Sequence, residues 1–133
     1  MSASRARGPI SEDLEPRIVS GPPRYQSKTN KAVEYIALAD RDDRVLGYFF
    51  ANDEDDAAGW QGRADVPPVS ANLAAPWIRF LRDAKKRGLK PSAALDELIQ
   101  RGADYSDRPR TRIVTTSRQA APSLAALKEV AGY

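Results

Sequence analysis

The densest hydrophobic pattern in the chain lies in residues 32–51, where two apolar runs flank a short charged segment. The runs are rich in β-branched and aromatic side chains, and residues 40–43 separate them. This pattern is typical of a β-hairpin with a polar turn. A loop made of residues 40–43 places Ile36 opposite Gly47. We therefore predict that this hairpin is the centre of the fold.

Both faces of the predicted hairpin are apolar, because side chains alternate between the two faces of a strand. One face carries Val33, Tyr35, Ala37, Leu46, Tyr48 and Phe50. The other face carries Glu34, Ile36, Leu38, Val45, Gly47 and Phe49. A two-stranded ribbon of this kind is not stable alone in water. Helices should therefore cover one face, and a further strand, a helix or a partner should cover the other.

Two helices are predicted after the hairpin, over 76–87 and 92–101. In the first, apolar side chains recur at helical spacing, and Gly88 follows a basic last turn. In the second, Ser92 stands where an N-cap residue is expected. The spacing of the leucines in this second segment predicts one apolar face that packs on the sheet.

The remaining pattern predicts an α+β fold. The β-branched run at 110–116 indicates a third strand beside the hairpin, and residues 123–130 indicate a short C-terminal helix. The architecture expected is a small antiparallel sheet packed against the helical pair. Residues 1–31 have too few apolar groups for a core and are predicted to be a flexible basic arm, which leaves 32–133 as a single domain.

A run of carboxylates, residues 53–56, directly follows the predicted hairpin. A calcium-binding loop would need ligands at alternate positions, a central glycine and a glutamate at the twelfth position, but the twelfth residue from Asp53 is Ala64. A short helix explains the run better, with Asn52 or Asp53 as N-cap and Gly59 at the end. We therefore predict a helix here and no metal site.

Composition narrows the functional classes further. The chain has 133 residues, of which 41% are hydrophobic, and it contains neither cysteine nor histidine. Without cysteine the chain cannot form disulfides. Without histidine it lacks the commonest general base and the commonest metal ligand. No apolar run reaches the roughly 18 residues that a membrane span needs, and no secretory leader is evident. Abundant arginine and alanine suggest a bacterial source. We expect a soluble, cytoplasmic protein that is not an enzyme and takes no cofactor.

Basic side chains on the first predicted helix form a candidate contact surface, because several of them share one helical stripe. The candidate basic residues are Arg79, Arg82, Lys85, Lys86, Arg87, Arg110 and Arg112. Such a cluster can bind phosphates or an acidic protein surface. The hairpin region is acidic and both flanks are basic, so these charges can also hold segments of the chain together.

Residues 76–101 resemble the DNA-binding helix-turn-helix, in which a glycine-containing turn joins two helices. Ala84, four residues before Gly88, suits the close helix crossing that such a unit requires. The second helix, however, carries Asp96 and Glu97 where a recognition helix faces phosphates and base edges, which is unfavourable. An ordinary helical hairpin packed on the sheet is therefore the favoured interpretation.

The sequence thus predicts a non-catalytic protein-interaction or regulatory module. Its contact surface is either the basic stripe or an uncovered apolar hairpin face that includes Ile36, Leu38 and Phe49. The alternative is a nucleic-acid-binding accessory protein that uses the stripe and the arm. Self-association through an unpaired edge of the hairpin is a third hypothesis. No membrane partner is expected.

Overall fold

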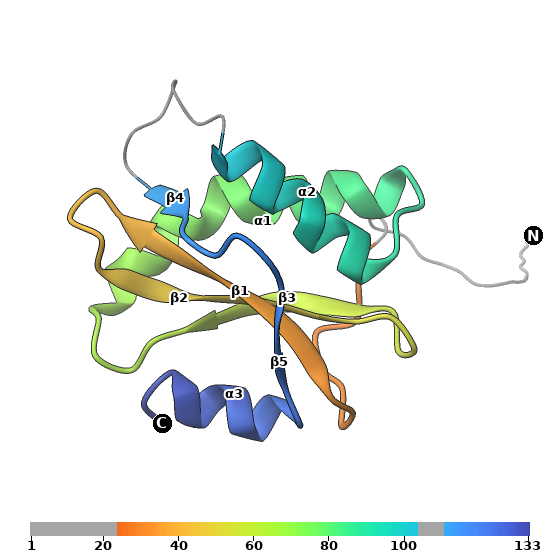
Figure 1. Cartoon of the computed structure of the whole chain (residues 1–133), viewed down its shortest axis with the longest axis horizontal. Helices are drawn as coiled ribbons and strands as arrows, with labels where there is room; N and C mark the ends of the chain where they lie inside the picture. Colours follow the sequence, from red (N-terminus) through yellow and green to blue (C-terminus); the bar gives the residue numbers. More distant parts are fainter. Residues whose placement is uncertain (1–23, 104–110) are drawn as a thin grey trace, which may run out of the picture.

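A five-stranded antiparallel sheet with helices on both of its faces forms the fold (Figure 1). The computed structural model describes residues 24–103 and 111–133. Within these ranges the elements are β1 (Val33–Asp40), β2 (Val45–Asn52), β3 (Ala57–Gly62), η3 (Pro68–Ala74), α1 (Ala75–Lys86), α2 (Pro91–Ala103), β4 (Thr111–Ile113), β5 (Gln119–Ala121) and α3 (Leu124–Val130). The strand order is β3-β2-β1-β4, and β5 also pairs with β1. The predicted α+β class is confirmed.

The hairpin is confirmed as β1 and β2, but the predicted register is wrong. Ile36 lies opposite Phe49 rather than Gly47, and the register shifts between Leu38 and Ala39. The turn is tighter than expected because Asp43 adopts a left-handed conformation, with φ of 63°. The resulting bulge moves Val45 to the opposite face from the one predicted, while the other large hairpin side chains in the two core clusters keep their faces.

The helix predicted after the hairpin is wrong, because residues 53–56 form a turn and the next residues form β3. The turn begins at Asn52, whose side-chain oxygen accepts the N–H of Asp55 at 2.8 Å, and Asp56 is left-handed with φ of 51°. Gly59 does not end a helix. It lies opposite Phe50, whose ring would be 2.9 Å from a Cβ at this position.

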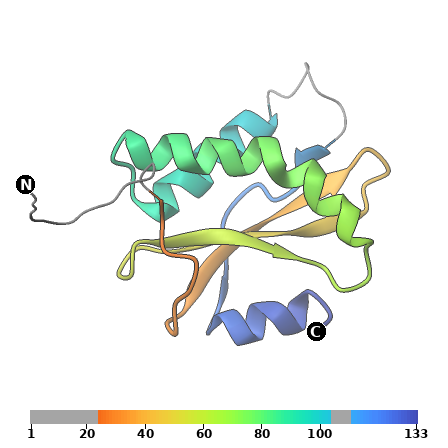
Figure 2. The same ribbon diagram turned by 180° about the vertical axis from the view of Figure 1, so that it is seen from behind.

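The predicted helical pair is confirmed as α1 and α2, which cover one face of the sheet (Figure 2). Gly88 makes the turn between them with φ of 80°, a conformation that favours glycine. The buried core under these helices consists of Ile36, Leu38, Phe49, Ala51, Ala58, Ala74, Trp77, Leu81, Ala84, Ala94, Leu95, Leu98 and Ile113. The Trp77 indole donates to the buried Thr111 hydroxyl at 2.9 Å, which ties α1 to β4.

The C-terminal helix α3 covers the second face of the sheet. Ser123 caps it by accepting the N–H of Ala126 at 3.0 Å, and Leu127 is fully buried. The second core consists of Val33, Ala37, Tyr48, Phe50, Ala121, Leu127 and Ala131. Figure 1 shows α3 on the opposite side of the sheet from α1 and α2. The two apolar faces of the hairpin are therefore both covered by the chain itself.

The edges of the hairpin are also occupied. The predicted third strand is observed as β4, which pairs with the end of β1, and the unpredicted β5 pairs with its beginning. On the other side, β3 pairs with β2 over its whole length. Self-association through a free edge of the hairpin is therefore wrong for this chain, because neither hairpin strand is an edge of the sheet.

Part of the predicted N-terminal arm, residues 1–23, lies outside the described residues. In residues 24–31, Tyr25 packs against the helical core, and its hydroxyl donates to the Leu89 carbonyl at 2.8 Å. Gln26 forms a parallel bridge with Ala57 at the start of β3. The segment before β1 thus contacts both the sheet and the turn between the helices.

Candidate functional site

Three exposed cations form a stripe along the outer face of α1, and we call Arg79, Arg82 and Lys86 the α1 stripe. Their spacing of three and four residues puts them on one side of the helix, and the rise of an α-helix separates the first from the last by about 10.5 Å. The opposite side of α1 buries Trp77 and Leu81 against the sheet. The amphipathic pattern of the helix therefore fixes the stripe in solvent.

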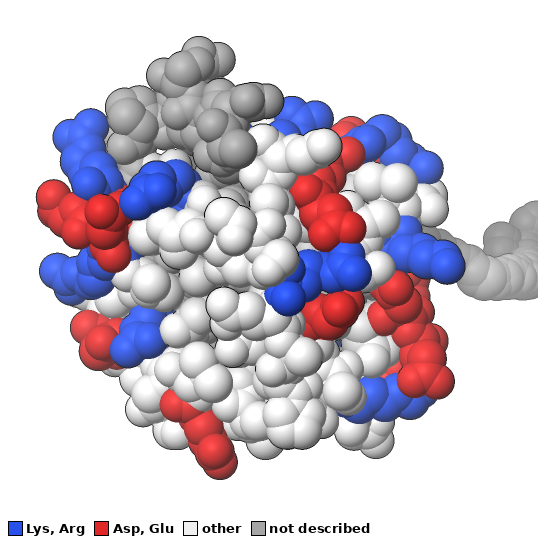
Figure 3. Space-filling view, viewed as in Figure 1, with Lys and Arg blue, Asp and Glu red and all other residues white. Residues whose placement is uncertain are grey.

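The α1 stripe has no carboxylate within ion-pair distance in the part of the chain that the structure describes. Among the described residues, seven of the other thirteen Lys and Arg side chains form ion pairs. In Figure 3, basic and acidic side chains lie next to each other around the face that carries α2, β4 and β5 and just right of its centre, and the remaining central area is uncharged. The stripe lies on α1, behind α2 in this view.

The neighbouring cations of α1 differ, because both are held by carboxylates. Lys85 pairs with Asp56, and its ammonium lies 5.5 Å from the centre of the Tyr25 ring. Arg87 donates to Glu97 at 2.9 Å and to Asp83 at 2.8 Å. Hydrogen bonds from Arg87 lower the pKa of the Glu97 carboxyl and those to Glu97 and Asp83 raise the pKa of Arg87. Both of these predicted site residues therefore serve the packing of the chain.

None of the remaining predicted site residues is shown to be a free contact residue. Arg112 on β4 pairs with Asp43 of the hairpin turn, and Arg110 lies outside the described residues. The apolar site residues were placed wrongly. Ile36, Leu38 and Phe49 are 0% exposed beneath the helices, so they cannot form a contact surface in the folded monomer.

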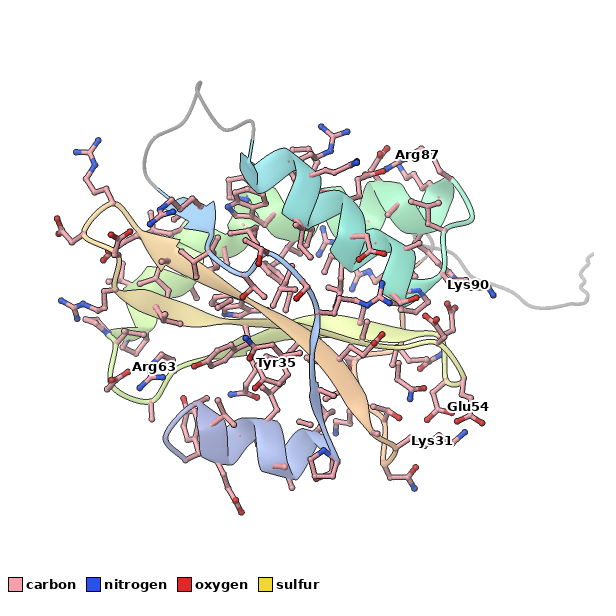
Figure 4. The ribbon with its side chains drawn as sticks, in the orientation of Figure 1. Lys31, Tyr35, Glu54, Arg63, Arg87 and Lys90 are labelled. Atoms are coloured by element: carbon pink, nitrogen blue, oxygen red, sulfur yellow. The ribbon has the colours of Figure 1, made fainter. Side chains whose placement is uncertain are left out.

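The carboxylates of residues 53–56, which we call the acidic turn, make contacts that the sequence did not predict. Asp53 accepts the N–H of Ser92 at 2.8 Å and its hydroxyl at 2.6 Å. Asp55 accepts from Thr29 at 2.6 Å and from Lys31 at 2.8 Å. The Lys31 hydrogen bond, followed by that of Thr29, lowers the pKa of the Asp55 carboxyl. Figure 4 places Lys31 and Glu54 at the same end of the sheet.

The acidic turn joins the segment before β1, the helices and the sheet. Asp56 holds Lys85 of α1, and Asp53 holds the first turn of α2. Ser92 was predicted as the N-cap of α2, but Pro91 is already helical, and the capping oxygens come from Asp53. The signal in the sequence was the excess of acid between two basic flanks, which indicated charge pairing without naming the partners.

We expect Asp53→Ala to lower the free energy of unfolding by about 1 kcal/mol, the usual value of a helix cap. The substitution leaves the Ser92 N–H without its acceptor and removes negative charge from the positive end of α2. Glu54→Ala is the matched control, since Glu54 is 76% exposed and lies 3.9 Å from Lys31. Urea denaturation should show little change for this control. Equal losses in both variants would contradict the capping role.

Tyr25 should ionise only at strongly alkaline pH. Burial, followed by the charge of Asp56, raises the pKa of its phenol to about 12. The folded state holds this proton more tightly than the unfolded state. The protonated Tyr25 phenol therefore contributes fully to the free energy of unfolding below pH 10, and this contribution is lost as the pH rises towards 12. A tyrosinate absorbance titration should show this late step in the wild type. Tyr25→Phe should abolish it and Tyr133→Phe should not.

The α1 stripe can bind a ligand through charge attraction but not through aromatic stacking. Trp77 is buried, and Phe80 is covered by the Arg101 guanidinium at 4.6 Å from the ring centre, so neither ring is free for a base to stack on. Within the described ranges, no group of three or more acidic side chains is placed to hold a metal ion. None of the described helices is both long enough and apolar enough to cross a bilayer.

Comparison of this chain with protein-family models, with curated proteins and with solved structures found no match.

Proposed function

We propose that this protein is a non-catalytic binding module that contacts an acidic surface of a partner protein through the α1 stripe. The observation that carries the proposal is the contrast along α1. Lys85 and Arg87 are neutralised by carboxylates, whereas Arg79, Arg82 and Lys86 are exposed and uncompensated among the described residues. Unpaired cations on a rigid helix steer an anionic partner and fix its orientation.

One feature supports a protein partner over a nucleic acid. The apolar face of α2, including Leu95 and Leu98, is buried on the sheet, while Asp96 on its outer side is exposed. These placements make α2 unsuitable as a base-reading helix.

The test uses the full chain and a labelled glutamate-rich peptide at low salt, with fluorescence anisotropy as the readout. Changing Arg79, Arg82 and Lys86 together to Glu should weaken binding at least about tenfold, since the attraction becomes repulsion. The matched control changes Arg41, Arg44 and Lys128 to Glu, three exposed cations outside α1. The control should bind like the wild type, and an equal loss in both triple variants would contradict the proposal.

Nucleic-acid binding is the second candidate, supported by the stripe's spacing along one helix face. A labelled DNA duplex in the same assay tests it. Three phosphate contacts predict that the logarithm of affinity falls with the logarithm of salt concentration with a slope of about −3. Tighter binding to the duplex than to the acidic peptide, with this slope and with the same loss in the stripe variant, would favour the nucleic-acid function.

A further inference from the structure

The first described residues lie beside the C-terminal end of α1. The Tyr25 hydroxyl donates to the Leu89 carbonyl at 2.8 Å, and the Lys85 ammonium lies 5.5 Å from the centre of the Tyr25 ring. Lys85 directly precedes Lys86, the last cation of the α1 stripe. Figure 2 shows the start of this segment below the end of α1 that leads into the turn before α2. The chain before residue 24 is therefore tethered close to the stripe.

The sequence before residue 24 contains three carboxylates within four residues. They are Glu12, Asp13 and Glu15, which we call the acidic run, and they lie outside the described residues. The acidic run carries three negative charges and the α1 stripe carries three positive charges. Because the two sets are equal in number and opposite in sign, each can neutralise the other. The acidic run is thus complementary in charge to the stripe.

Two other stretches of four residues hold three or more carboxylates, 40–43 and the acidic turn. Both are committed to contacts elsewhere in the fold. In the first, Asp40 accepts two N–H groups of its own turn, and Asp43 pairs with Arg112. The acidic turn is bonded to the segment before β1 and to both helices. Neither stretch is free to reach the α1 stripe of its own molecule, which leaves the acidic run.

The link between the acidic run and the described fold is long enough to reach the stripe. Residues 15 and 24 are nine positions apart, and nine extended residues span at most about 30 Å. The stripe is about 10.5 Å long, and a helix with its side chains is about 10–12 Å across. The link therefore reaches every cation of the stripe. Its short length also holds the acidic run near the stripe at an effective concentration of the order of 1 mM.

We propose that the acidic run binds the α1 stripe of its own chain and competes there with the acidic partner. This inference rests on the proposed function, because it assigns an internal ligand to the same surface. The ion pairs are exposed and therefore weak, so a partner with more carboxylates displaces the run. Weakly acidic surfaces do not displace it. The run is thus an autoinhibitory ligand that restricts the stripe to strongly acidic partners.

A spin label on residue 11 of the full chain tests the contact directly. The chain has no cysteine, so Ser11→Cys provides a single attachment site. The label should broaden the NMR amide signals of Arg79, Arg82 and Lys86. It should leave the signals of α3 sharp, because α3 lies on the opposite side of the sheet. Sharp signals along the whole stripe would overturn the proposal.

Two controls show whether the carboxylates cause the contact. Replacing the acidic run by Glu12→Gln, Asp13→Asn and Glu15→Gln in the spin-labelled chain should remove the broadening. Raising the salt from about 0.01 M to 1 M should also remove it, because the Debye length falls from about 30 Å to about 3 Å. Broadening that survives both changes would contradict an electrostatic contact.

A mixing experiment identifies the molecule that supplies the acidic run. Chain enriched in ¹⁵N without a spin label is mixed with an equal amount of spin-labelled chain without ¹⁵N. The stripe signals should stay sharp in this mixture, because each stripe is occupied by its own chain. Broadening as strong as in the singly labelled protein would assign the acidic run to a second copy and overturn the contact within one chain.

The peptide assay measures the competition. Neutralising the acidic run should raise the affinity of the full chain for the glutamate-rich peptide at least about twofold, since a stripe that is free half of the time binds half as tightly. The matched control neutralises three other exposed carboxylates, by Asp42→Asn, Glu54→Gln and Glu129→Gln. Both variants change the net charge equally, so equal affinities in the two would overturn the autoinhibition.

The two proposals fail in different ways. A peptide that binds neither the wild type nor the neutralised chain contradicts the proposed function, while the spin label still decides whether the acidic run contacts the stripe. Peptide binding that depends on the stripe but is the same with and without the acidic run contradicts the internal ligand and leaves the proposed function in place.

Discussion

Replacing Phe49 with alanine should lower the free energy of unfolding by about 3–5 kcal/mol, a large fraction of the stability of a small domain. The ring is 0% exposed, and its centre lies 4.8 Å from that of Trp60. Truncation leaves a cavity between the sheet and the helices that rigid strands cannot close. Urea or guanidinium denaturation of the purified variant measures the change.

The control for this variant distinguishes a core residue from a surface residue of the same chemical type. Val69 in η3 is apolar but 67% exposed, so Val69→Ala should change stability by no more than about 0.5 kcal/mol. If Phe49→Ala were as stable as the wild type, the closed core would be contradicted and an exposed apolar face would again be the better interpretation.

Gly47→Ala should lower the free energy of unfolding by about 1–3 kcal/mol or more, although it adds a single methyl group. A Cβ at this position would lie 2.5 Å from the Gln61 carbonyl oxygen and 2.5 Å from the Trp60 ring. The carbonyl belongs to the neighbouring strand β3, so relief requires the two strands to move apart. Thermal and urea denaturation should both detect the loss.

Gly62→Ala is the matched control, because Gly62 is the partner of Gly47 across the two strands. A Cβ there would lie 3.5 Å from the Trp60 indole nitrogen, an ordinary contact distance. We expect its stability to remain close to that of the wild type. Equal destabilisation in the two variants would indicate that glycine is needed for the strand backbone in general and would exclude the specific clash at Gly47.

Those parts of the fold with strong local patterns could be predicted from the sequence. The hairpin and the two helices combine long periodic patterns with clear stop signals such as Gly88. The acidic turn misled the prediction because carboxylates before small residues are also typical of a helix start. β3 and β5 consist mainly of alanine, glycine and glutamine, which have little strand preference of their own. Pairing with a neighbouring strand decides their structure, and that information is not local.

The sequence predicted which basic residues lie on α1, but it did not predict which of them lack a carboxylate partner. Helical spacing placed Arg79, Arg82 and Lys86 together on one stripe of α1. The predicted contact residues also included Lys85 and Arg87. Which cations remain uncompensated depends on distant carboxylates, such as Asp56 for Lys85. The predicted helical pair covers the face that carries Ile36, Leu38 and Phe49, and the seven-residue helix α3 covers the opposite face, so neither face is left for a partner.

The acidic turn also bears on the order of events during folding. Its contacts join residues far apart in the sequence, since Asp53 and Ser92 are separated by 39 positions and Asp56 and Lys85 by 29. These bonds require both the finished β2–β3 turn and the docked helical pair, so they form after the sheet has met the helices. Weakening them should therefore speed unfolding far more than it slows folding. The contacts of the acidic turn therefore form late in folding. They determine the rate of unfolding rather than the rate of folding.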